Sequence, residues 1–264
     1  MKAKDIMHPE DAKAIQTIQN IKGIDKFIRM YMNMGYESVY RGENMANMIQ
    51  ATKETFPEIY GAFQEVVNIV GIREPKLYIY NDPVINAFTY GETDTFIALS
   101  SGMIEHLDIE ELKGAMAHEC GHILCKHTLY MTILETIKYA GTFFKFINYS
   151  LLSPIFLAMQ YWSRKSELSA DRCGAAVVGE ECYQRILAKL ASGMKHTSKF
   201  TRELIEQGKS YVAFKRASLW NRVQQESRSM FYSHPQLCVR ALELDRWKDS
   251  YAYRELINTI KLDK

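Results

Sequence analysis

His118-Glu119-Cys120-Gly121-His122 reads H-E-x-x-H and lies in a segment whose apolar residues are spaced as in a helix. Residues four apart share one face of a helix, so the imidazoles of His118 and His122 can reach one metal ion together. Glu119 is offset by one residue and would lie beside that ion. Two imidazole nitrogens and an adjacent carboxylate are what a zinc hydrolase needs. Because a helix can also carry these residues as ordinary packing, the hypothesis requires a third ligand elsewhere.

The composition is that of a globular protein. Of the 264 residues, 47 % are hydrophobic and 24 % are charged, so the chain can bury a sizeable core. A net charge of +2 is too small to argue for nucleic-acid binding. No internal repeat, low-complexity run or Pro/Gly/Ser-rich linker interrupts the sequence, which indicates one domain.

Cysteine usage and the N-terminus indicate a compartment. The five cysteines are odd in number and no two are spaced as C-x-x-C, which argues against a disulfide framework or a cysteine-based zinc ribbon. A reducing compartment fits better. The N-terminus has no apolar core and carries acids early, so it is not a secretory signal. We therefore expect a cytoplasmic protein.

One apolar stretch, residues 139–162, is long enough to be considered for a membrane. It is rich in Phe, Leu and Ile but also holds Lys145, Asn148, Pro154 and Gln160. A spanning helix needs about 20 predominantly apolar residues. We interpret this stretch as a buried or membrane-touching helical hairpin, and a true span is the alternative.

The hydrophobic periodicity predicts an α+β fold that is mostly α. Residues 11–34 have the spacing of two short helices, and a further helix is expected over residues 57–70. Three strands that would form a small antiparallel sheet are expected at 76–80, 86–90 and 95–100. A helix then begins at Asp108, with Glu111 in the capping-box position, and runs into the H-E-x-x-H.

The residues directly after the H-E-x-x-H do not supply a third ligand. Metzincins place Gly three residues and His six residues after the second histidine, but Cys125 and Thr128 occupy those positions, so that class is excluded. His127 lies off the helix face that His118 and His122 share. We interpret it as a surface histidine rather than a ligand.

Glu167-Leu168-Ser169-Ala170-Asp171 offers another solution, because Glu167 and Asp171 are again four apart. Glu167 would complete a site of two histidines and one glutamate and leave the fourth position for water. Asp171 would accept a hydrogen bond from the outer nitrogen of a ligand histidine, which fixes its tautomer. A solvated helix face is the alternative, and the H-E-x-x-H about 45 residues upstream favours the ligand role.

Such a site implies metal-assisted hydrolysis. Zinc lowers the pKa of a coordinated water to about 7 and polarises the scissile carbonyl. Glu119 would take the proton of the water and pass it to the leaving amine. A further group is needed to stabilise the oxyanion that develops.

Together with Ser233-His234-Pro235 and Arg240, the two motifs resemble the zinc metallopeptidases of the HtpX and CAAX-prenyl-protease type, which are gluzincins. The likeness covers roughly residues 57–247, including NAFTYG at 86–91 and FIALSSG at 96–102. It implies a thermolysin-like catalytic core whose small antiparallel sheet presents its edge strand to the active-site helix. It also implies one metallopeptidase domain over residues 1–264, divided into an N-terminal helical segment (1–56), a catalytic core (57–250) and a C-terminal helical tail (251–264).

The resemblance also implies residue roles. His118, His122 and Glu167 would bind one Zn²⁺ per chain. His234 would stabilise the tetrahedral intermediate, and the alternative is that it only caps a helix opened by the following proline. Arg240 would brace the site electrostatically, and the alternative is a surface arginine.

By the same resemblance, Asn86, Ala87 and Phe88 would form the edge strand onto which a substrate peptide adds. The alternative is that Asn86 and Phe88 are only strand and core residues. The substrates would be peptides, or unfolded or membrane-derived proteins.

The chain also departs from these relatives. They have clear transmembrane helices and this sequence does not, so we expect a compact, soluble or peripheral member. Cys120 stands where a leucine-like residue is usual and is expected to pack in the core. The basic segment 195–228 is either a solvated helical face or a surface for anionic lipid or an acidic partner. Peripheral membrane contact would come through it or through residues 139–162.

These observations predict a zinc-dependent metalloendopeptidase that acts in protein quality control or processing. A catalytically silent zinc-binding module, chaperone-like or membrane-associated, is the alternative, and the intact Glu119 argues against it. An aminopeptidase would need a group that captures the free amine of the substrate, and the sequence offers no such motif.

Overall fold

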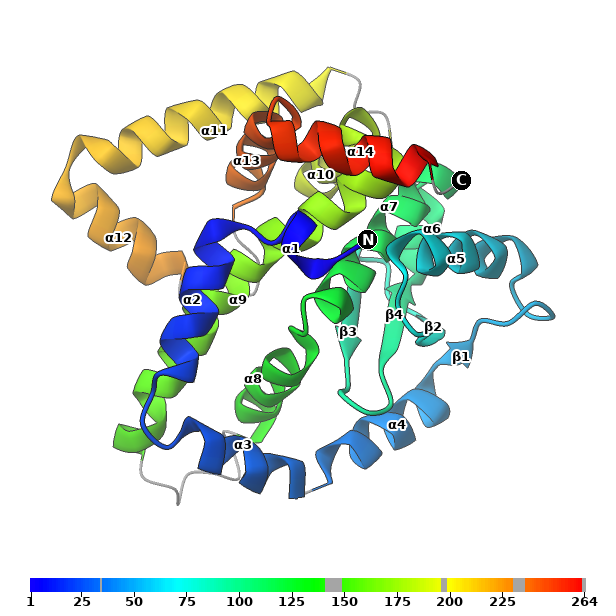
Figure 1. Ribbon diagram of the computed structural model, residues 1–264, viewed down its shortest axis with the longest axis horizontal. Helices are drawn as coiled ribbons and strands as arrows, with labels where there is room; N and C mark the ends of the chain where they lie inside the picture. Colours follow the sequence, from blue (N-terminus) through cyan, green and yellow to red (C-terminus); the bar gives the residue numbers. More distant parts are fainter. Residues whose placement is uncertain (34, 141–148, 196–198, 230–235, 263–264) are drawn as a thin grey trace.

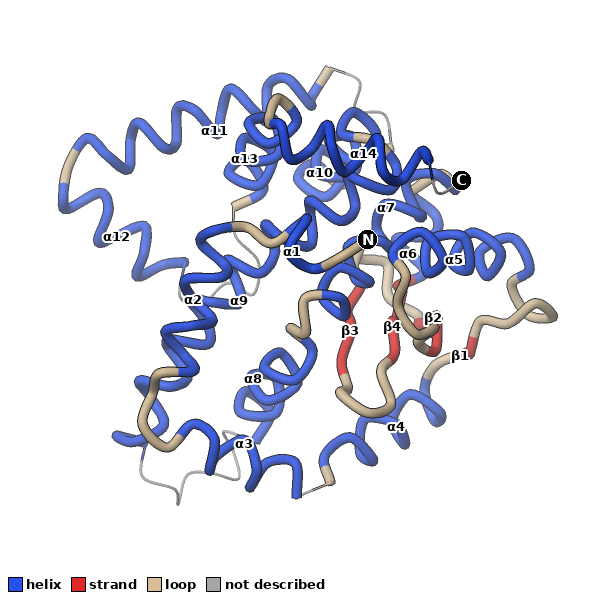
Figure 2. Tube along the Cα trace, viewed as in Figure 1, coloured by secondary structure: helices blue, strands red, loops and turns tan. Residues whose placement is uncertain are grey.

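The computed structural model describes residues 1–33, 35–140, 149–195, 199–229 and 236–262. Within them the chain is mostly helical with one small sheet, as Figure 2 shows, which confirms the expected fold class. The helices are α1 (Ala3–Ile6), α2 (Pro9–Gln19), α3 (Ile24–Asn33), α4 (Tyr36–Asn47), α5 (Pro57–Val70), α6 (Ser101–His106), α7 (Ile109–Leu124), α8 (Thr128–Ala140), α9 (Tyr149–Val178), α10 (Glu180–Ser192), α11 (Phe200–Ala217), α12 (Leu219–Ser229), α13 (Leu237–Lys248) and α14 (Tyr251–Leu262). The strands are β1 (Ile49–Gln50), β2 (Lys76–Tyr80), β3 (Ala87–Tyr90) and β4 (Phe96–Ser100).

The sheet is mixed, with the strand order β1-β2-β4-β3. β4 pairs antiparallel with β3 but parallel with β2, and β1 pairs antiparallel with β2. The expectation of a wholly antiparallel sheet was therefore wrong. Strand spacing does not reveal that β3 takes the outer edge and that its hairpin partner β4 returns between β3 and β2. As an edge strand, β3 packs beside α7, as expected.

α7 begins with the expected capping box. The Asp108 carboxylate accepts from the backbone amide of Glu111 at 2.9 Å, and the Glu111 carboxylate accepts from the backbone amide of Asp108 at 3.0 Å. Glu111 is buried, and Lys189 of α10 donates to it at 2.6 Å, so its charge is paired. The cap thus fixes both where α7 starts and how it is joined to α10.

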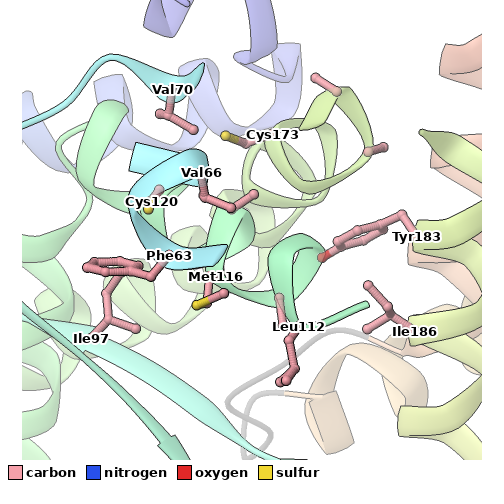
Figure 3. Close-up of a cluster of buried hydrophobic side chains, with 14 of the residues drawn as sticks. Phe63, Val66, Val70, Ile97, Leu112, Met116, Cys120, Cys173, Tyr183 and Ile186 are labelled. Carbon is pink, nitrogen blue, oxygen red and sulfur yellow. The ribbon is translucent and has the colours of Figure 1, made fainter. Parts of the chain in front are cut away.

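The main hydrophobic core surrounds α7, and Figure 3 shows part of it. Side chains from α5, β4, α9 and α10 converge there on Leu112, Met116 and Cys120 of α7. Cys120 is fully buried, as expected. The labelled partners in that view are Phe63, Val66, Val70, Ile97, Cys173, Tyr183 and Ile186.

α7 and α9 approach each other closely at Gly121. A Cβ at Gly121 would lie 2.7 Å from the Cβ of Cys173 and 3.1 Å from the Cα of Ala170. No larger residue fits at this contact without moving one of the helices. The approach brings the last turns of α7 beside the part of α9 that carries Glu167 and Asp171.

The N-terminal helix α2 packs along α9 in Figure 1, from the turn of Met159 and Trp162 up to Ser169. Of the stretch 139–162, residues 141–148 lie outside the described residues, and residues 149–162 form the start of α9. Met159 and Trp162 are buried there against Ile18 of α2 and Ile133 of α8. No helix in the described part of the chain combines the length and the apolarity needed to cross a membrane.

Candidate metal centre

Three side chains from α7 and α9 converge on one point. Nε2 of His118 lies 3.3 Å from Nε2 of His122. Oε2 of Glu167 lies 3.5 Å from Nε2 of His118, and Oε1 of Glu167 lies 3.4 Å from Nε2 of His122. Atoms held about 2.0–2.2 Å from one ion at tetrahedral angles are roughly 3.3–3.6 Å apart, and each histidine has one Glu167 oxygen at about this separation. The three residues are buried and form a group that could hold a metal.

The outer nitrogen of His118 is held by Asp171 and Tyr183. Nδ1 lies 3.1 Å from Oδ1 of Asp171 and 2.8 Å from the hydroxyl of Tyr183, which itself donates to Asp171 at 2.8 Å. A proton held on Nδ1 leaves the lone pair on Nε2, where the donor atoms converge. Burial lowers the pKa of His118, but the carboxylates of Asp171 and Glu167 outweigh it and raise the pKa to about 9.

Arg240 of α13 joins the two carboxylates of α9. Its Nε donates to Asp171 at 2.8 Å and its Nη1 lies 2.9 Å from Glu167. Burial raises the pKa of Asp171, but the charge of Arg240 and the contact with His118 hold it below its ordinary value. Arg240 is buried, so the alternative of a surface arginine is excluded.

His122 has a different outer partner, His127. Their Nδ1 atoms lie 3.0 Å apart, and Nε2 of His127 lies 3.0 Å from the Asp11 carboxylate of α2. His127 is buried, so the prediction of a surface histidine was wrong. The helix ends at Leu124, Lys126 takes the left-handed conformation (φ 58°), and the amide of His127 donates back to the carbonyl of His122 at 2.8 Å. The turn carries His127 back under His122, where a continuing helix would have turned it away.

Asp11 is fully buried and has several partners besides His127. Trp162 Nε1 donates to one of its oxygens at 3.0 Å, and the hydroxyl of Ser169 donates to the other. Burial raises the pKa of Asp11, but the contact with His127, followed by those with Ser169 and Trp162, holds it below its ordinary value. Burial is the main reason why the pKa of His122 falls to about 4.

Glu119 is buried beside the converging donors, on the same helix. Burial, followed by the negative charges of Asp82 and Glu119, raises the pKa of the Tyr80 phenol. The Tyr80 hydroxyl accepts from Nδ2 of Asn86 at 3.1 Å. Tyr80 therefore links the start of the expected substrate strand to the neighbourhood of Glu119.

Of the expected substrate strand, Ala87 and Phe88 lie in β3 and Asn86 precedes it. Asn86 is tied to β4, because its amide donates to Ser100 Oγ at 3.0 Å and its carbonyl accepts from the Ser100 amide at 2.9 Å. Phe88 packs in an aromatic cluster with Tyr80 and Phe96. The Phe88 side chain thus serves the core, and what remains for a peptide is the outer edge of the β3 backbone.

His234 lies outside the described residues, between α12 and α13. Arg240, six residues further on, is described and reaches the centre.

Sequence reasoning missed Tyr183, Asp11 and the role of His127. Tyr183 fits beside Asp171 because Gly174 leaves room: a Cβ there would lie 2.1 Å from the tyrosine ring. Glycine inside a long helix, three residues after Asp171, was a signal that another group approaches α9 at this turn. No local pattern marks Asp11, which comes from a helix more than a hundred residues away in the sequence.

Comparison with known proteins gives a family and a relative. A family model described as Peptidase family M48 matches residues 53–248. A protein of Arabidopsis thaliana, the plastoglobule-localized metallopeptidase 48 of the chloroplast, is 26 % identical over 260 residues, which cover 97 % of this chain and 75 % of the relative. The family match includes the converging residues, Tyr183 and Arg240 but not Asp11.

Proposed function

The chain belongs to peptidase family M48, and on this premise we propose that it is a zinc-dependent metalloendopeptidase. The observation that carries the proposal is the convergence of His118, His122 and Glu167 at separations of 3.3 to 3.5 Å. Two imidazoles and one carboxylate are the protein ligands of a catalytic zinc that keeps an open position. We propose that these three residues hold one Zn²⁺ per chain.

Zinc, when bound, would lower the pKa of water and polarise the scissile carbonyl. Glu119 would accept the proton of the attacking water and deliver it to the leaving amine. Asp171 and Tyr183 would keep the His118 proton on Nδ1, and Arg240 would hold Asp171 and Glu167 in place as carboxylates. We propose that His234 donates a hydrogen bond to the oxyanion, as the resemblance implies.

We propose that the substrate enters as an extended segment along the β3 edge. Backbone pairing at an edge strand gives affinity with little dependence on sequence, which suits cleavage of unfolded segments. This supports a role in protein quality control or processing. The family match over residues 53–248 supports a catalytic core at 57–250. The packing of α2 and α14 on α9 supports residues 1–56 and 251–264 as helical parts of the same domain. Five free cysteines support a reducing, cytoplasmic compartment.

Metal analysis combined with proteolysis tests the proposal. Wild type, Glu119→Gln and Glu110→Gln would be purified, assayed for bound zinc, and tested on casein and on peptides blocked at the N-terminus. Glu110 is the control, because it is exposed on the same helix. All three should hold one zinc per chain, and Glu119→Gln should lose at least a hundredfold in rate. Absence of stoichiometric zinc, or blocked peptides cleaved as fast by Glu119→Gln as by wild type, would refute it.

A further inference from the structure

α11 and α12 meet at a corner on the periphery of the molecule, at the left of Figure 1. α12 is amphipathic: Leu219, Trp220 and Val223 fall within about 100° of each other around the helix, and Asn221 and Gln225 fall on the opposite side. In a globular protein the apolar side of such a helix normally faces the core.

Here α12 is packed the other way round. Its polar residues make the contacts with α11: Asn221 Nδ2 donates to the carbonyl of Phe214 at 3.0 Å, Gln225 accepts from the Tyr211 hydroxyl at 3.5 Å, and Glu226 pairs with Lys215. The apolar side is turned to solvent. Leu219 is 76 % exposed, Trp220 67 % and Val223 50 %, and Phe214 at the end of α11 is 50 % exposed.

These four side chains, which we call the corner patch, are unusual as a group. Single exposed apolar residues are normal on protein surfaces, but four of them gathered where two helices meet, Trp, Phe and Leu included, mark an interaction surface. None of the four takes part in the candidate metal centre, so the patch serves something other than the chemistry.

The charge around the corner patch identifies its partner. Residues 209–228 hold five Lys or Arg and one Glu, a net charge of +4, whereas the whole chain has only +2. Arg216 lies four residues before Trp220 in the sequence, and Arg222 lies two residues after it. Exposed Trp, Leu and Phe beside arginines are the composition of a helix that lies in the interface of an anionic membrane.

The shape favours lipid over another protein. The apolar side chains stand on a projecting corner, and a stable protein interface buries roughly 800 Å² on each partner, more than four side chains offer. A lipid surface needs no matching shape.

We infer that the α11–α12 corner docks on an anionic lipid surface, with the corner patch at the acyl boundary and Arg216 and Arg222 at the headgroup phosphates. This inference is independent of the proposed peptidase activity.

Vesicle flotation of the full-length chain tests it. Vesicles of phosphatidylcholine with phosphatidylglycerol would be compared with vesicles of phosphatidylcholine alone. Wild type should float with the anionic vesicles, more weakly as salt is raised, and at least tenfold less with the neutral ones. The double variants Leu219→Glu with Trp220→Glu and Arg216→Glu with Arg222→Glu should each lose at least tenfold.

The control is Tyr251→Glu, which changes an equally exposed residue at the start of α14 and should float like wild type. Circular dichroism and solution peptidase activity should be unchanged in all these variants. The inference is overturned if wild type does not float, if neutral vesicles bind it equally, if the corner variants float like wild type, or if Tyr251→Glu loses as much as they do.

Fluorescence gives a second readout that loss of folding cannot mimic. Trp220 is exposed, whereas Trp162 and Trp247, the other two tryptophans, are buried. Anionic vesicles should shift the emission to shorter wavelength, and lipids with brominated chains should quench it. Trp220→Phe should abolish both effects while still floating. Effects of wild-type size in Trp220→Phe would show that Trp220 does not enter the lipid and would overturn the inference.

Discussion

The Asp11 carboxylate lies 3.0 Å from Nε2 of His127, whose Nδ1 lies 3.0 Å from Nδ1 of His122. Asp11 favours a proton on Nε2 of His127, which leaves Nδ1 as an acceptor for the Nδ1 proton of His122. The lone pair of His122 is then on Nε2, where His118 and Glu167 converge. Asp11 lies outside the family match, so a helix beyond the shared core takes part in orienting the proposed metal site.

Replacing His127 should weaken zinc binding without removing a ligand. His127→Phe keeps a ring against Trp162 but removes both nitrogens. Loss of such an outer partner typically costs about ten- to a hundredfold in metal affinity. Zinc competition with a chromophoric chelator would measure it, with Asp11→Asn expected to show a smaller loss and the exposed neighbour Glu10→Gln none. Equal affinities for wild type and His127→Phe would show that His122 needs no support from this side.

Asp11 should also stabilise the fold in a pH-dependent way. Its pKa is lower in the folded chain, so ionised Asp11 favours folding. The contribution is present above the pKa of an unfolded aspartate, about 3.9, and is lost as pH falls through the lower folded pKa. In urea unfolding with chelator present, Asp11→Asn should cost about 1–3 kcal/mol at pH 7 and progressively less below pH 4. A difference that stayed constant with pH would contradict this assignment.

The contact at Gly121 should couple stability to the metal site. Gly121→Ala places a methyl group 2.7 Å from the Cβ of Cys173, so α7 and α9 must separate. We expect about 1–3 kcal/mol of destabilisation, measured by chemical unfolding, together with weaker zinc binding. Gly61→Ala is the matched control, because a Cβ there meets nothing within 4 Å; it should stabilise the helix by about 0.5–1 kcal/mol. If both variants behaved alike, the helix contact would not be tight.

The residues that sequence could place are those whose geometry is local. His118 with His122, and Glu167 with Asp171, are each one helical turn apart, and the capping box at Asp108 is likewise a short-range pattern. The strand order could not be predicted, because no local pattern shows that β4 lies between β2 and β3 in the sheet. His127 was misplaced because one left-handed residue, Lys126, redirects the backbone. Tyr183 and Asp11 reach the centre only through the packing of α10 and α2 on α9.

Arg240 should be the most costly of the supporting residues to lose. It faces two buried carboxylates, so Arg240→Met leaves Glu167 and Asp171 close together without their cation. Breaking a buried pair in this way costs about 3–5 kcal/mol. Arg240→Lys should recover little, because one ammonium cannot reproduce the fork that reaches both acids.

Urea unfolding of the zinc-free protein would measure the loss. The control is Arg246→Met, which breaks an exposed pair with Glu243 and should cost less than about 1 kcal/mol. Adding Asp171→Asn to Arg240→Met should restore part of the stability, since one uncompensated charge is removed. An Arg240→Met variant no less stable than Arg246→Met would mean that Arg240 does not hold the carboxylates together.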